Sequence, residues 1–146
     1  MGIQDANTAG NVHGGTIMKL VDEVAGVAAV RHCGTRVVTA ALDRMTFTEP
    51  VYVGQLVTVM ATVNAAWRTS MEIGVRVQAE NVRTGEITHT STAYVTMVAL
   101  TDEGEPTPVP GVEPETDDER RRQREAQLRR DNRLREREEI MRGRGE

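Results

Sequence analysis

DANTAGNVHGGTIMKLVDE, residues 5–23, is the stretch that decides the fold. Its first half is polar and interrupted by glycine, so a loop is expected there. From Ile17 onward the apolar residues recur at the i, i+3, i+4 spacing of a helix with one buried face. The pattern predicts a helix from about Gly14 to Cys33, which Gly34 ends.

The start of this predicted helix can carry chemistry. The first N–H groups of a helix have no partner within it and lie at the positive end of its dipole. Gly14 and Gly15 have no Cβ, so an anion or a developing oxyanion can approach their backbone. Asp22 falls at the edge of the apolar face, where partial desolvation would make a carboxylate more basic. Spacing alone leaves a plainer interpretation open, a tight turn followed by an ordinary surface carboxylate.

The rest of the first hundred residues is typical of strands. Alternating or β-branched segments predict strands at residues 36–42, 56–65, 69–80 and 86–100, with a turn at 81–85. In the clearest of them Met71, Ile73 and Val75 point one way, and Glu72 and Arg76 the other. One long amphipathic helix and several half-polar strands predict an α+β fold, an antiparallel sheet wrapped around one central helix.

A different composition begins after residue 100. Residues 101–114 are rich in Pro, Gly, Glu and Thr and indicate a linker. Thr116 and Glu119 form a capping-box pattern that predicts a helix in the charged segment that follows. Its apolar residues are sparse, so we expect a solvated and marginally docked helix; a partner-binding arm is the alternative. The chain therefore divides into a domain of residues 1–112 and a charged helical tail of residues 113–146.

Composition limits the function classes. The chain of 146 residues has a net charge of −4 and no basic surplus in the domain or the tail, which argues against a nucleic-acid partner. No apolar run reaches the length of a membrane span. The single cysteine, Cys33, suits a reducing compartment, so we expect a cytoplasmic protein. The histidines His13, His32 and His89 lack metal-ligand spacing, and no metal is expected.

Other nucleophiles are weak candidates. Cys33 has His32 beside it, but neighbours on a helix point about 100° apart. Ser70 and Ser91 lie in alternating strands without the G-x-S-x-G turn of serine hydrolases.

The whole pattern resembles a known family. DANTAGNVHGGTIMKLVDEVAGVAAVRHCG, followed by VVTAALDRMTFTEPVYVGQLV, RTSMEIGVRVQAEN and THTSTAYVTMVAL, is similar to the hotdog-fold acyl-CoA thioesterases, particularly the cytosolic acyl-CoA hydrolases. The resemblance covers nearly the whole chain, and the N-x-x-G-N-x-x-G-G opening is specific. It implies a helix wrapped by an antiparallel sheet, pairing of two such units edge to edge, and active sites at the dimer interface. A homodimer or a higher homo-oligomer, often a hexamer, is then expected.

The resemblance also assigns residues. Asn7 matches a catalytic asparagine, Asp22 a catalytic carboxylate on the helix, and Asp43 a catalytic aspartate in the tandem-domain relatives. Gly14 and Gly15 match the helix start whose backbone amide holds the thioester oxygen. The segment near the coenzyme A phosphates corresponds, more loosely, to Arg68, Thr69 and Ser70. Relatives usually carry a first strand before the asparagine loop, where this chain has only four residues. Either the sheet is one strand short, or the chain has been cut or started late.

The expected activity is hydrolysis of fatty acyl-CoA to the free acid and coenzyme A. No cofactor is implied, because coenzyme A is part of the substrate. As the tandem-domain relatives are the more similar, Asn7 and Asp43 are favoured as the essential pair, with Asp22 in support. Two alternatives remain: a non-catalytic acyl-CoA-binding module, and another hotdog enzyme such as a hydratase.

Overall fold

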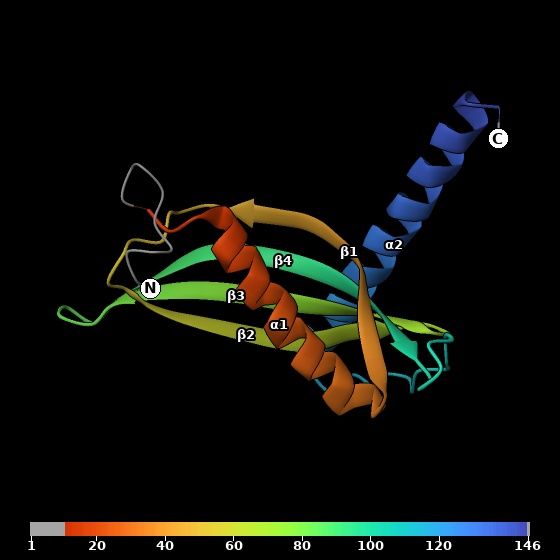
Figure 1. Ribbon diagram of the computed structural model, residues 1–146, viewed down its shortest axis with the longest axis horizontal. Coiled ribbons are helices and arrows are strands. Elements are labelled where there is room, and N and C mark those ends of the chain that lie inside the picture. Colours follow the sequence, from red (N-terminus) through yellow and green to blue (C-terminus); the bar gives the residue numbers. More distant parts are fainter. Residues whose placement is uncertain (1–10, 146) are drawn as a thin grey trace.

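The computed structural model describes residues 11–145, which form two helices and one four-stranded sheet. The elements are α1 (Gly14–Cys33), β1 (Arg36–Phe47), β2 (Leu56–Ala66), β3 (Ser70–Asn81), β4 (Glu86–Leu100) and α2 (Asp117–Gly143). All strand pairs are antiparallel, in the order β1-β4-β3-β2. The predicted α+β fold with a hotdog arrangement is confirmed (Figure 1).

The two helices lie on opposite faces of the sheet. In Figure 1, α1 crosses one face with β1 curving around its side, and α2 leaves the other face. Ile17, Val21, Ala25 and Ala29 of α1 are at most 1% exposed. They pack against the alternate residues of β3 and β4 that face them, including Met71, Ile73, Val95 and Met97. This apolar layer is the core, and we call the other side of the sheet, where α2 lies, its outer face.

The end of α1 follows the prediction. Gly34 adopts φ +73°, a left-handed conformation that favours glycine, and its N–H donates to the carbonyl of Val30 at 2.8 Å. β1 runs five residues beyond the predicted end at residue 42. Register shifts between Thr39 and Ala41 and between Asp43 and Thr46 interrupt its alternation, so the period-2 pattern failed to reveal its full length.

The tail differs from the expectation of a marginally docked helix. Its predicted cap is present, since the Thr116 hydroxyl accepts from the Glu119 N–H at 3.1 Å. Ala126 of α2 is fully buried against the outer face, and Arg129 forms an ion pair with buried Glu72. The C-terminal end of α2 projects beyond the sheet (Figure 1), and its residues from Leu134 onward are exposed. The division of the chain at residue 112 stays a prediction.

Candidate active site

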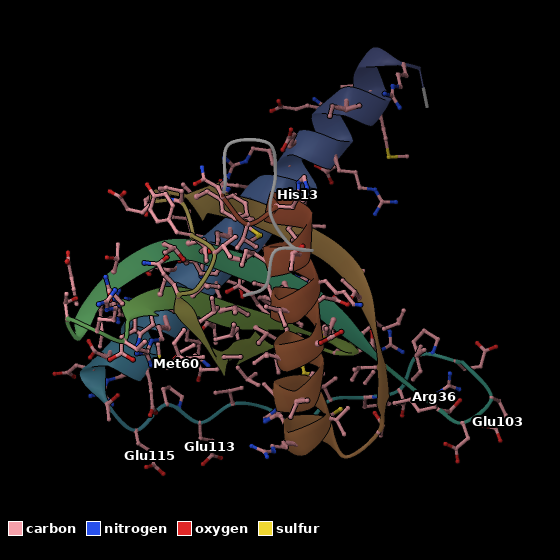
Figure 2. All side chains as sticks on the ribbon, turned by 60° about the vertical axis from the view of Figure 1, so that its left-hand side comes forward. His13, Arg36, Met60, Glu103, Glu113 and Glu115 are labelled. Atoms are coloured by element: carbon pink, nitrogen blue, oxygen red, sulfur yellow. The ribbon has the colours of Figure 1, made fainter. Side chains whose placement is uncertain are left out.

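The start of α1 presents backbone donors to solvent. His13 precedes the helix without a side-chain cap, and its carbonyl accepts from the Thr16 N–H at 3.0 Å (Figure 2 labels His13 at this end). Among residues 11–145 the N–H groups of Gly14 and Gly15 have no hydrogen-bond partner. Both glycines are exposed, and a Cβ placed on Gly15 would meet no atom within 4 Å. An acceptor oxygen can therefore reach these donors directly.

The loop that leads into the helix is fixed to the body. The Val12 N–H donates to the carbonyl of Val51 at 2.7 Å, and Val12 is buried. Asn11 forms an isolated bridge with Tyr52. The position of the helix start is thus set by the segment that connects β1 to β2.

Asp22 has a partner that sequence reasoning missed. The Thr39 hydroxyl of β1 donates to Asp22 Oδ1 at 2.5 Å. Thr39 pairs with Met97, a core residue, so its side chain lies on the α1 face of the sheet. The only sequence signal for this contact was a hydroxyl early in the strand after the helix. That hydroxyl comes next to Asp22 only once the chain has folded. Both side chains are exposed, so the desolvation expected for Asp22 is not supplied by its own chain.

Asp43 lies on the other face of the sheet. It pairs with Tyr94, and Tyr94 pairs with Gly74 on the outer face. The Arg133 guanidinium of α2 donates to Asp43 Oδ2 at 2.8 Å. A single chain therefore does not bring Asp43 together with Asp22 or with the helix start.

Distance also separates Asp22 from the helix start. Seven residues separate Gly15 from Asp22, which at about 1.5 Å per residue places their backbones roughly 10 Å apart. A carbonyl oxygen held by the Gly15 N–H would be too far from this carboxylate for an intervening water to bridge them.

Arg68 and Thr69 lie in the turn between β2 and β3, and Ser70 is the first residue of β3. The carbonyls of Arg68 and Thr69 accept from the N–H groups of Val109 and Ala99, each at 2.9 Å. The turn lies at the opposite end of the sheet from the helix start, about seven residues of β3 or roughly 23 Å away. Within one chain, its side chains are therefore too short to reach Gly14 or Gly15.

The remaining candidates are placed as follows. Asn7 lies outside the described residues. His32 Nε2 is 2.8 Å from the Pro110 carbonyl and Cys33 Sγ is 3.3 Å from the Thr35 hydroxyl, so both side chains have other partners.

Within residues 11–145 no three His, Cys, Asp or Glu side chains gather as metal ligands. In this part of the chain neither helix combines the length and apolar content that a bilayer crossing requires.

Comparison with known proteins gives consistent matches. The model of the thioesterase superfamily matches residues 9–86. The cytosolic acyl coenzyme A thioester hydrolase of Rattus norvegicus is 41% identical over 124 residues, which are 84% of this chain and 32% of that protein. This chain thus spans about a third of that relative's length.

Two solved structures match nearly the whole fold. An apo-hexameric acyl-CoA thioesterase has a TM-score of 0.90 and 38% identity, covering 93% of this chain and 87% of that one. An acyl-CoA hydrolase from Staphylococcus aureus, in complex with butyryl coenzyme A and coenzyme A, has a TM-score of 0.89 and 36% identity, covering 98% and 87%. Further structures of the S. aureus protein are of alanine variants at an asparagine, an aspartate 15 residues later and a threonine 17 residues beyond.

Proposed function

This chain belongs to the thioesterase superfamily, and from that premise we propose that it is an acyl-CoA thioester hydrolase whose active site is shared between two copies. We infer a shared site because the groups that it needs lie too far apart within one chain. The free donors at the start of α1 and the Asp22–Thr39 pair both face solvent, roughly 10 Å apart along the helix. The helix start and the Asp22–Thr39 pair therefore each need a second copy to complete a site.

The sheet offers a way to bring them together. β1 is an edge strand, and its outer edge is unpaired within the described chain. Two-fold pairing of β1 with its copy would set the two α1 helices antiparallel and side by side. The helix start of one copy would then approach the middle of the other helix, where Asp22 lies. Pairing would also exclude water from Asp22 and Thr39, which are exposed in a single chain.

The contacts favour Asp22 as the base, whereas the resemblance to the tandem-domain relatives favours Asp43. Asp22 is held by a neutral hydroxyl on the α1 face, whereas Asp43 is neutralised by Arg133 on the outer face. The separations in the S. aureus variants support the same choice, because Asn7, Asp22 and Thr39 have the same residue types and the same spacings of 15 and 17 residues. Asn7 is accordingly proposed as the third member of the site.

The chemistry follows from these roles. The thioester carbonyl oxygen accepts from the Gly15 N–H, with Gly14 beside it, and Asn7 orients the water or the carbonyl. Asp22 of the other copy takes a proton from water as its oxygen bonds to the carbonyl carbon. The tetrahedral intermediate, stabilised at the helix start, collapses by breaking the C–S bond. The coenzyme A thiolate takes up the proton, leaving the free acid and coenzyme A.

The substrate's nucleotide end is assigned to Arg68, Thr69 and Ser70, as the resemblance implies. The reaction consumes only water and substrate. Because a hexameric relative shares the fold, we further propose that paired copies assemble into a hexamer. Because the Rattus norvegicus relative is named as cytosolic, we also propose that the protein works in the cytoplasm.

The activity is tested by incubating the protein with acyl-CoA substrates of increasing chain length and measuring release of free coenzyme A thiol. We expect thiol release that follows enzyme concentration and is lost in Asp22→Asn. Saturable binding of acyl-CoA without thiol release would instead favour the non-catalytic binding module. Acyl-CoA consumed as a hydrated thioester, with no free thiol, would favour a hydratase.

A further inference from the structure

A cavity of about 400 Å³ lies between α2 and the outer face of the sheet. Its floor comes from two cross-strand rows, Met60–Arg76–Thr92 and Thr62–Gly74–Tyr94. Its roof comes from the first turns of α2, and Figure 2 shows labelled Met60 beside them. The proposed hydrolysis uses the α1 face, so this cavity has no part in it.

The walls of the cavity are strongly cationic. Four arginines line it (Arg76, Arg121, Arg122 and Arg129), against one lining acid, Glu125. Arg129 is neutralised by Glu72 at 2.8 Å, and Arg121 lies 3.6–3.7 Å from Asp118 and Glu125. Neither Arg76 nor Arg122 has a hydrogen-bond or ion-pair partner in residues 11–145. Two uncompensated guanidinium groups, one from the floor and one from the roof, therefore face the same space.

The floor also holds a buried acceptor without a donor. Asn64 is 4% exposed, and its Nδ2 donates to Glu72 Oε2 at 3.0 Å. Its Oδ1 has no partner in the described structure. Asn64, Thr62 and Arg122 also line a second cavity of about 240 Å³, so the three mark the junction of the two. A buried amide oxygen left unpaired calls for a hydroxyl or N–H group beside it.

We propose that this cavity binds a small phosphate ester, with its phosphate between Arg76 and Arg122 and its hydroxyl groups toward Thr62 and Asn64. Guanidinium groups bind phosphate through paired, charge-assisted hydrogen bonds. Bare phosphate would leave most of 400 Å³ unfilled, so an organic body is expected against Met60 and Tyr94. The site is separate from the thioester site, because it lies on the other face of the sheet.

Calorimetric titration of the full chain tests the proposal. The probes are glycerol 3-phosphate, inorganic phosphate, the neutral analogue glycerol, and adenosine 3′,5′-bisphosphate, which is a fragment of coenzyme A. We expect glycerol 3-phosphate to bind more tightly than phosphate, and glycerol not to bind. Arg76→Gln combined with Arg122→Gln should weaken binding by at least about tenfold.

Arg124→Gln is the matched control, because Arg124 is an exposed arginine of the same helix turns that does not line the cavity. Thermal unfolding of each variant checks that the fold is retained. The proposal would be overturned if Arg124→Gln weakened glycerol 3-phosphate binding as much as the double variant does. It would also be overturned if glycerol 3-phosphate bound no more tightly than glycerol. Loss of glycerol 3-phosphate binding when coenzyme A or its bisphosphate fragment is added would assign these arginines to the substrate instead. The titration needs no turnover, so its result is independent of whether the chain hydrolyses thioesters.

Discussion

The carboxylate of Asp22 accepts a hydrogen bond from a neutral hydroxyl, whereas that of Asp43 accepts one from a guanidinium. Asp43 is thereby tied to α2 on the outer face, whereas Asp22 lies on the α1 face with the free donors of the helix start. The family resemblance identifies both aspartates and ranks Asp43 first, whereas the contacts favour Asp22. The ranking depends on Thr39 and Arg133, which lie 17 and 90 residues away along the chain.

Substituting each aspartate separates the two roles. Asp22→Asn is expected to lower kcat by about 10³-fold or more, because an amide accepts no proton from water. Asp43→Asn should change kcat by no more than roughly threefold, since it removes only a partly exposed ion pair. Steady-state thiol release measures both. A silent Asp22→Asn with an inactive Asp43→Asn would return the base to Asp43.

Thr39 is expected to act as a positioning residue. Thr39→Val removes the hydroxyl donor at nearly constant shape and should lower kcat by roughly tenfold, with a smaller change in KM. Thr39→Ser keeps the donor and should recover most of the rate. If valine and serine lower kcat equally, the hydrogen bond to Asp22 contributes nothing to turnover.

At the scale of elements, α2 binds the sheet through arginine more than through apolar contacts. Arg129 donates from Nε and Nη2 to the two oxygens of Glu72, whose side chain is 3% exposed, and lies 3.6 Å above the Tyr94 ring. Burial disfavours the charge of Arg129, but its hydrogen bonds to Glu72 and the charge of that residue raise the pKa of Arg129 above its ordinary value. The Arg129 guanidinium therefore keeps its charge. We call its two-bond pairing with Glu72 the clamp.

This clamp explains what the sequence could and could not predict of the tail. Thr116 and Glu119 predicted the helix start because a cap is a local signal. Docking was missed because it depends on Glu72, which the alternation of β3 had placed on a solvated face. Likewise, α1 was predicted because its periodicity is regular, while bulges in β1 concealed that strand's end.

Breaking the clamp should destabilise the fold. Arg129→Ala leaves the Glu72 carboxylate buried without its cation, and we expect the free energy of unfolding to fall by about 3–5 kcal/mol. Arg137→Ala, at an exposed position of the same helix, is the matched control and should change it by less than about 0.5 kcal/mol. Urea unfolding followed by circular dichroism measures both. Similar midpoints for the two variants would mean that the ion pair is not needed for stability.

At the scale of the whole molecule, the proposed sharing of the site can be tested by complementation. In a mixed dimer of Asn7→Ala and Asp22→Ala chains, one of the two sites keeps both native residues. After subunit exchange in equal amounts, thiol release should recover to about one quarter of the native rate, because half of the dimers are mixed and each holds one intact site. Mass spectrometry of isotope-labelled chains confirms exchange. No recovery after confirmed exchange would place Asn7 and Asp22 in the same chain's site.

The open edge of β1 also ties catalytic output to protein abundance. If each site forms only on pairing, diluting the enzyme below its dimer dissociation constant removes sites as well as molecules. Specific activity would then fall on dilution and recover on concentration, and a saturating substrate that bridges two copies would delay the fall. A cell that produces little of this protein would thus have disproportionately little thioester hydrolysis, a threshold set by assembly.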